Sequence, residues 1–437
     1  MSNSVTKDQF SSRWGFILAA VGAAIGMGNI WLFPYRVGEL GGATFIIHYI
    51  ICVAVLGFIG VLGEITIGRL TGAGPVNAFK KALEMRGGSG RIGEVFGWIP
   101  IFVIFVISLG YSVVVSWILR FFVGSITGSA FIACNTAQHF TAITGSCAWQ
   151  WIIITLFVIG ISMIRGVEKG IEKANKFMIP IFFVLFLILV MRVAFLPKAI
   201  DGYKFLFMPK WDFFFNARTW ILALGQSFYS LSIFGSISVV YGSYTKKSED
   251  LIFSVKNIVI FDTVASIMAS LVIIPAVFSF GKDLNSESAL MFITIPDIFK
   301  AMPLGQICMV IFFLAVFFAA ITSLISILEV VVEVLQNKFK IHRSLSVAIT
   351  VSTVAICSIL SNGYIDKLTD ILQIHFVPFC ALISGIFIFW ILPSKLFTKE
   401  IQSGHTKTVS KWIIPMGRYV FCGLVIVIYI SNILCVV

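Results

Sequence analysis

The stretch RWGFILAAVGAAIGMGNIWLFPYR, residues 13–36, contains the most informative pattern in this chain. It is long and apolar enough to cross a bilayer, yet Gly22, Gly26 and Gly28 lie near its middle. The polar Asn29 follows directly. Each interior glycine costs a helix about 1 kcal/mol, and backbone freed at that depth must be covered by protein or a polar cavity. The pattern therefore predicts either a helix broken at a binding site or glycines used for close helix packing.

The composition of the whole chain supports a membrane setting. The 437 residues are 59% hydrophobic and 12% charged, and the mean hydropathy is +1.01. Soluble domains are charged at about a quarter of their positions, so we predict an all-α, polytopic membrane protein with the lipid bilayer as its partner. The net charge of +12 is better explained by basic cytoplasmic loops than by nucleic-acid binding. We recognise no nucleotide-binding loop, metal cluster or nucleophile with a base, so we do not expect an enzyme.

The apolar segments predict eleven transmembrane helices. The expected spans are residues 14–37, 43–69, 91–124, 149–165, 173–196, 218–243, 252–280, 305–336, 343–361, 371–393 and 412–435. The longer loops between them, at 125–148, 197–217 and 281–304, are expected to contain short surface helices.

The distribution of basic residues predicts the orientation. With the N-terminus inside, 22 of the 32 lysines and arginines fall on the inner side, which favours the N-terminus inside and the C-terminus outside the plasma membrane. We therefore expect a cytoplasmic segment at 1–12, a transporter core at 13–393, a cytoplasmic loop at 394–411 and an eleventh helix within 412–437. Cys134 and Cys147 would share an outer loop, which permits a disulfide.

A second interrupted segment lies five spans after the first. Residues 220–244, WILALGQSFYSLSIFGSISVVYGSY, place Ser230, Ser232 and Gly235 at mid-membrane. Paired interruptions of this kind indicate two inverted repeats of five helices, at about 13–196 and 218–393, with helices 1 and 6 broken.

Several polar groups inside the membrane suggest cation sites. Backbone carbonyls near Gly22, Ala24 and Ile25, with the Asn29 amide, would form an oxygen-rich group without charge. An ionised Asp262 costs about 3 kcal/mol or more at mid-membrane, and no lysine or arginine is expected at its depth, so a cation or proton site is favoured over an ion pair.

Two further groups have local explanations as well as functional ones. Thr322 and Ser323, with the Ala319 carbonyl one turn back, offer three oxygens to a small cation, although both hydroxyls could instead bond to their own helix. Glu64 in LGEITIGR could accept hydrogen bonds from the unpaired amides of a broken helix.

Several motifs together resemble the neurotransmitter:sodium symporter family, in particular its eleven-span bacterial amino acid transporters. The segments GAAIGMGNIWLFPYRVGELGGATF, LGEITIGR, RGVEKGIEKANKFMIP, GQSFYSLS and AAITSLISILE carry the resemblance, in order along nearly the whole chain. The resemblance implies a central amino acid site with two sodium sites. The first sodium site would contain Ala24, Asn29, Ser230 and Asp262, and the second Gly22, Ile25, Ala319, Thr322 and Ser323.

The resemblance also implies a set of substrate-binding residues. These are Ala23, Ala24, Met27, Gly28, Ile107, Tyr111, Tyr229, Ser230, Ser232, Phe234, Gly235, Ser323 and Ile327. We expect Tyr111 and Phe234 to form an aromatic lid over this site.

Three positions depart from the family pattern. Leu32 replaces the usual gate arginine, and we expect Arg36, one turn further on, or a water bridge to replace part of the gate with Asp370. Asp262 stands where chloride-dependent members often have asparagine, which predicts chloride-independent transport. The order Phe234–Gly235 alters the pocket wall, and with it the choice of substrate.

The combined pattern predicts a sodium-coupled symporter that imports a neutral, hydrophobic or aromatic amino acid by alternating access. Two alternatives remain: a proton-driven amino acid carrier of the same architecture, and a transport-inactive amino acid sensor.

Overall fold

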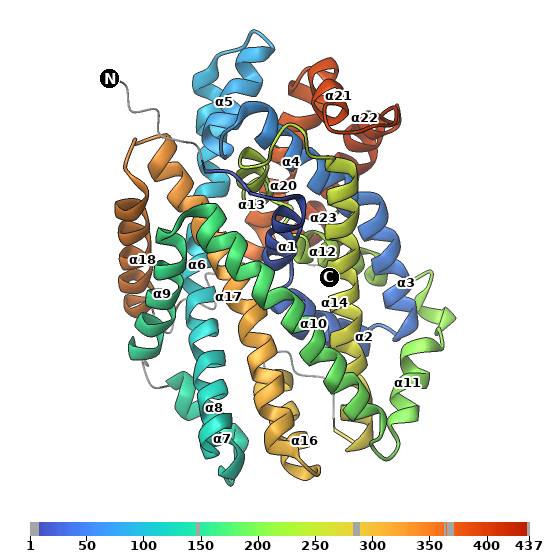
Figure 1. Ribbon diagram of the computed structural model, residues 1–437. Helices are drawn as coiled ribbons and strands as arrows, with labels where there is room; N and C mark the ends of the chain where they lie inside the picture. Colours follow the sequence, from blue (N-terminus) through green and yellow to red (C-terminus); the bar gives the residue numbers. More distant parts are fainter. Residues whose placement is uncertain (1–7, 146–148, 283–288, 362–363, 365–370, 435–437) are drawn as a thin grey trace.

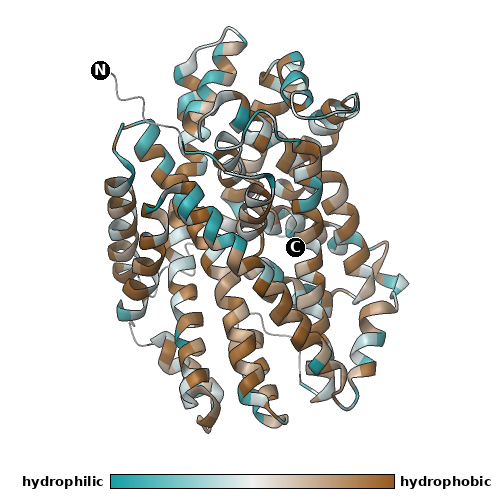
Figure 2. Cartoon of the chain, in the orientation of Figure 1, coloured by the Kyte–Doolittle hydropathy of each residue, from teal (hydrophilic) through white to brown (hydrophobic). Residues whose placement is uncertain are grey.

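The structure is a computed structural model in which all regular secondary structure of the described residues is helical, as the sequence predicts. It describes residues 8–145, 149–282, 289–361, 364 and 371–434. Hydrophobic residues cover long stretches of the helices, while hydrophilic residues are frequent near α5 (Pro75–Met85) and α21 (Ser394–Gln402) (Figure 2). These two helices lie at one end of the molecule, and α7 (Ser129–Ile132) and α16 (Ile295–Ala301) lie at the other (Figure 1).

Eight of the described helices are long and apolar enough to cross a membrane. They correspond to expected spans two, three, five and seven to eleven. They are α3 to α4 (Ala43–Thr71), α6 (Gly90–Thr127), η3 with α10 (Val167–Ala194), α14 (Leu251–Ser279), α17 (Gly305–Asn337), α18 (Arg343–Leu360), α20 with its flanking turns (Ile374–Ile391) and α22 to α23 (Ile413–Ile433).

The expected total of eleven spans is not confirmed. Among the described residues the number rises to ten only if two bent helix pairs each count as one span. The expected fourth span is occupied by α9 (Trp149–Ile164), which has 16 residues. The expected sixth is divided into α12 (Ala217–Ser230) and α13 (Ile237–Ser243), with 14 and 7 residues, each too short to span a bilayer alone.

The break in the first span is confirmed. Helix α1 (Arg13–Ala24), which includes Gly22, ends two residues before Gly26, and helical structure resumes at η1 (Gly28–Leu32), which runs into α2 (Phe33–Glu39). The two halves are bent by 58°. The glycines allowed either a broken helix or close helix packing, and the backbone shows that the helix is broken.

The break in the sixth span is confirmed as well. Between α12 and α13 the backbone of Ser232 has φ 52° and that of Gly235 has φ 76°. Positive φ is costly for a residue with a side chain, and surrounding contacts hold the segment in place. The Gly235 amide donates to Glu64 Oε1 at 2.6 Å, so Glu64 caps unpaired backbone as the sequence predicts.

The two broken helices lie in the middle of the molecule (Figure 1). Helix α1 packs against α10 (Lys173–Ala194), α14 and α17, and α17 in turn packs against α6. This arrangement surrounds the freed backbone with protein, which is the condition for irregular chain at membrane depth.

The three longer loops contain short helices, as expected. They are α7 and α8 (Thr136–Gly145) in the first loop, α11 (Ala199–Phe207) in the second and α16 in the third. The disulfide that the sequence permits between Cys134 and Cys147 involves a cysteine outside the described residues.

Candidate functional site

A small central cavity of ≈ 50 Å³ lies where the two breaks meet. Twelve of the thirteen predicted substrate residues line it: Ala23, Ala24, Met27, Gly28, Ile107, Tyr111, Tyr229, Ser230, Ser232, Phe234, Ser323 and Ile327. Four lining residues were not predicted, namely Gly26, Ile104, Ile237 and Val377. Gly235 is not among the lining residues, because it faces Glu64 and Ser384 instead.

Two glycines make room for the walls of this cavity. A Cβ on Gly26 would lie 2.7 Å from the Tyr111 hydroxyl and 3.0 Å from Ser323 Oγ. A Cβ on Gly28 would lie 2.8 Å from the Tyr229 ring. Real Cβ atoms do not approach other atoms so closely, so these two positions need glycine for close packing, the second of the two roles that the sequence allowed.

The Tyr111 side chain points its polar end at the freed backbone. Its hydroxyl is buried and makes no hydrogen bond within the described part of the chain. A buried hydroxyl without a partner is costly, and a ligand carboxylate in the cavity would supply an acceptor.

One side of the cavity carries a cluster that contains a carboxylate. Asn29 Nδ2 donates to Asp262 Oδ1 at 2.7 Å and to Ser230 Oγ at 2.9 Å. Ser230 Oγ donates to both Asp262 oxygens, each at 2.8 Å. Tyr49 donates to Asp262 Oδ2 at 3.0 Å, and Ser266 Oγ accepts from Asn29 at 2.9 Å. We call these five residues the charged cluster.

The structure thus brings together the three side chains predicted for the first sodium site. The Asn29 amide turns its nitrogen toward the carboxylate, while its Oδ1 accepts from the Gly26 amide at 3.1 Å. A half-turn of this amide exchanges its oxygen and nitrogen and would present an oxygen to a cation beside Asp262. The Ala24 residue, whose carbonyl was predicted as a further ligand, lines the adjoining cavity.

Sequence reasoning missed Tyr49 and Ser266 in this cluster. Ser266 lies four residues after Asp262 on α14, so helical spacing could have identified it. Tyr49 comes from α3 (Ala43–Cys52), 213 residues away from Asp262 along the chain. Nothing in its local sequence indicates that contact.

A second cluster lies between the end of α1 and the middle of α17, and its oxygens carry no charge. Ser323 Oγ donates to the Ile25 carbonyl at 2.7 Å and to the Gly22 carbonyl at 3.1 Å. Thr322 Oγ1 donates within its own helix, as the local alternative allowed, to the Phe318 carbonyl at 2.9 Å and the Ala319 carbonyl at 3.0 Å. All five predicted residues of the second sodium site therefore lie together, and we call them the neutral cluster. Oxygen ligands of this kind suit hard cations.

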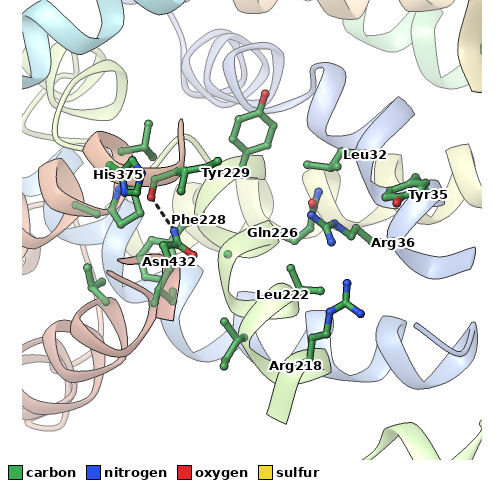
Figure 3. A pocket seen from close by; sticks show the side chains of 18 of the residues that line it. Leu32, Tyr35, Arg36, Arg218, Leu222, Gln226, Phe228, Tyr229, His375 and Asn432 are labelled. Carbon is green, nitrogen blue, oxygen red and sulfur yellow. Dashed lines mark hydrogen bonds between the residues drawn. The ribbon is translucent and has the colours of Figure 1, made fainter. Parts of the chain in front are cut away.

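A wider vestibule of ≈ 560 Å³ lies next to the cavity. Leu32, Tyr35 and Arg36 lie on one side of it and His375 and Asn432 on the other (Figure 3). The vestibule and the cavity share two lining residues, which are Tyr229 and Val377. These two side chains therefore lie between the vestibule and the cavity, and Tyr111 and Phe234, the residues expected to form the lid, line the cavity itself.

The predicted Arg36–Asp370 gate cannot be placed, because Asp370 lies outside the described residues. Among the described residues, Arg36 contacts Glu39 on its own helix, with 3.4 Å between Nη1 and Oε2. Arg218 of α12 contacts the same carboxylate at 2.8 Å. Glu39 thus joins the two broken helices at the rim of the vestibule.

Comparison with known proteins agrees with this geometry. The sequence matches the profile of the Sodium:neurotransmitter symporter family over residues 7–147 and 136–436. It is 35% identical to the sodium-dependent transporter YhdH of Bacillus subtilis over 331 residues, covering 74% of this chain and 71% of YhdH. It is 27% identical to a sodium-dependent transporter of Haemophilus influenzae, covering 99% of both chains.

A solved structure resembles the whole molecule. The crystal structure of MhsT in complex with L-phenylalanine superposes with a TM-score of 0.86 at 30% identity, covering 97% of this chain and 99% of MhsT.

Proposed function

Because the chain belongs to the sodium:neurotransmitter symporter family, we propose that it imports a neutral amino acid together with sodium. The observation that carries this proposal is the position of the two clusters. Both lie against the broken first helix and beside the same cavity, so ions and substrate would bind to one shared piece of freed backbone.

The proposed coupling follows from charge. A sodium ion at the charged cluster would compensate Asp262, and the carboxylate of an amino acid bound next to it would add a further ligand. Each partner would then bind more tightly when the other is present, and this effect is reciprocal. Inward movement of sodium contributes about 2.3 kcal/mol per charge for each 100 mV of membrane potential.

The proposed substrate carries a hydrophobic or aromatic side chain. Ile104, Ile107, Phe234 and Ile327 give the cavity apolar walls, and the similar protein MhsT was solved with L-phenylalanine. The cavity of ≈ 50 Å³ is smaller than the roughly 300 Å³ or more of common ligand sites. Substrate entry from the vestibule therefore requires Tyr229 and Val377 to move apart.

The proposed orientation places the end with α5 and α21 in the cytoplasm, because most lysines and arginines gather on that side. The vestibule would then open outward. We further propose that transport does not need chloride, since Asp262 supplies a fixed negative charge among its donors Asn29, Tyr49 and Ser230.

The test is uptake of each of the twenty amino acids into proteoliposomes under an inward sodium gradient. We expect accumulation of one or more hydrophobic amino acids in sodium, none in choline, and equal uptake in chloride and gluconate. Uptake that persists in choline and follows a proton gradient would contradict sodium coupling. Binding without accumulation would identify a sensor.

A further inference from the structure

Asn175 on α10 has a buried amide oxygen that its surroundings leave unused. The side chain is fully buried. Its Nδ2 atom donates to the Ile171 carbonyl on its own helix at 2.9 Å, which turns Oδ1 away from α10. Within the part of the chain that the structure describes, Oδ1 has no hydrogen-bond partner. A buried polar atom without a partner typically costs a protein about 1–3 kcal/mol.

This oxygen lies directly against the neutral cluster. A Cβ on Gly22 would meet Asn175 Oδ1 at 1.9 Å and the Thr322 Cβ atom at 3.1 Å. Oδ1 and the Thr322 Cβ are therefore at most 5.0 Å apart, the sum of these two distances. Oxygens that bind one cation of calcium's size lie about 2.5 Å from it, so two such oxygens are up to about 5 Å apart. The Thr322 hydroxyl is attached to that Cβ, so Oδ1 and the Thr322 side chain are close enough to face the same ion. Asn175 reaches the cluster because Gly22 has no side chain.

The neighbouring charged groups do not use this oxygen. Glu172, one turn earlier, accepts hydrogen bonds from the Ser11 amide at 2.7 Å and the Ser12 hydroxyl at 3.0 Å. It also pairs with Lys176 at 2.6 Å. The Asn175 oxygen is thus a neutral acceptor on α10, and it faces the neutral cluster, whose carbonyls and hydroxyls suit a cation.

We propose that Asn175 Oδ1 is an additional oxygen ligand for the sodium ion held by the neutral cluster. This inference rests on the proposed function of that cluster. It assigns α10 a direct role in ion binding, beside the two helices α1 and α17 that provide the other ligands. It also gives a role to a buried amide whose side chain, among the described residues, bonds only to the Ile171 carbonyl of its own helix.

The test measures equilibrium binding of ²²Na⁺ to the purified full-length protein for the wild type and three variants. Asn175→Leu removes both the oxygen and the donor, whereas Asn175→Asp keeps an oxygen but loses the donor to Ile171. Thr350→Val is the matched control, since its buried hydroxyl on α18 also has no hydrogen-bond partner in the described residues. Asn175→Ala replaces the leucine variant if the latter does not fold.

We expect the leucine variant to bind sodium about tenfold more weakly, the size typical of losing one polar contact to a charged group. The aspartate variant should bind at least as tightly as the wild type, and Thr350→Val should be unchanged. The inference is overturned if Asn175→Leu binds normally, if the control is weakened equally, or if the leucine and aspartate variants are weakened alike. The last result would mean that only the donor to Ile171 matters.

The same assay separates this inference from the proposed function. A wild-type protein that binds no sodium, or a Ser323→Ala variant that binds it as the wild type does, would reject the neutral cluster as a sodium site and the Asn175 inference with it. Normal Asn175→Leu binding, with wild-type binding that depends on Ser323, would reject the role of Asn175 alone.

Discussion

The charged and the neutral cluster use the same broken helix but differ in how they would receive a cation. Asp262 carries a negative charge that Asn29, Tyr49 and Ser230 stabilise by hydrogen bonds. The neutral cluster offers only carbonyl and hydroxyl oxygens, with Ser323 already bonded to two of the carbonyls. A cation therefore compensates a buried charge at one cluster and introduces a charge at the other.

This difference predicts that single substitutions weaken cation binding to different degrees at the two clusters. An uncompensated charge at membrane depth is costly, so the charged cluster should lose most when its one carboxylate is removed. The neutral cluster spreads its ligands over several backbone groups that no side-chain substitution deletes. Its response to any one substitution should therefore be smaller.

The largest effect is expected for Asp262→Asn. Removing one partner from a buried charged interaction typically costs about 3–5 kcal/mol, so sodium-driven uptake without chloride should fall by at least about 100-fold. Added chloride should restore part of it by supplying the missing charge. Uptake by the wild type should be the same with and without chloride. Wild-type uptake that requires chloride would contradict this role of Asp262.

A smaller loss is expected for Ser323→Ala. The change removes one hydroxyl ligand, so sodium should bind about tenfold more weakly, as for a polar contact to a charged group. Ser326→Ala, one turn further on the same helix, is the control, because Ser326 is not one of the proposed ligands and its hydroxyl contacts Tyr241 and the backbone carbonyl of Thr322. Sodium titration of uptake measures both variants. If sodium binds equally weakly to both variants, the loss comes from a disturbance of α17 and not from a missing ligand at Ser323.

Tyr49→Phe should have a smaller effect of the opposite sign, because sodium should bind more tightly rather than more weakly. The lost hydroxyl stabilises Asp262 in the absence of a cation, and a bound sodium ion can take over that role. The variant should therefore bind ²²Na⁺ about three- to tenfold more tightly. This change is no larger than the free energy of one hydrogen bond to a charged group. Tyr241→Phe serves as the control. Weaker sodium binding in Tyr49→Phe would place its hydroxyl in the ion-bound state instead.

The smallest effect on ion binding is expected far from both clusters, at Asp250. Burial alone would raise the pKa of this carboxyl, but hydrogen bonds from His405 and the Phe253 amide outweigh it and lower the pKa. Asp250 also caps α14, so Asp250→Ala should cost about 1 kcal/mol of stability. Sodium affinity should not change.

The pH dependence of this contribution has a defined sign. A carboxyl whose pKa is lowered on folding stabilises the protein above the usual aspartate range, and that stabilisation is lost as the pH falls through the lowered pKa. Thermal unfolding of the wild type and Asp250→Ala should therefore converge toward acid. A gap in stability that widens at low pH would contradict the assignment.

The sequence alone was sufficient where a local pattern carried the information. Three glycines followed by Asn29 limited the first span to a break or to close packing, and the matching interruption in the sixth span favoured the break. Membrane depth singled out Asp262, and adjacent hydroxyls singled out Thr322 and Ser323. Each of these signals combines an apolar surrounding with a residue that is costly there. Such conflicts between a residue and its environment are typical of functional positions.

The sequence was insufficient where a contact joins distant spans or depends on backbone direction. Tyr49 and Asn175 reach their clusters through helix packing, which no local pattern encodes. Gly235 has a positive φ that turns it toward Glu64 and away from the cavity.

The most direct test of the two-cluster account is the number of ²²Na⁺ ions bound per chain at saturation, with a transported amino acid present. The account predicts two ions in the wild type. In Asp262→Asn and in Ser323→Ala, one ion should remain at its wild-type affinity while the other binds more weakly. A single saturable ion in the wild type, or none, would contradict it.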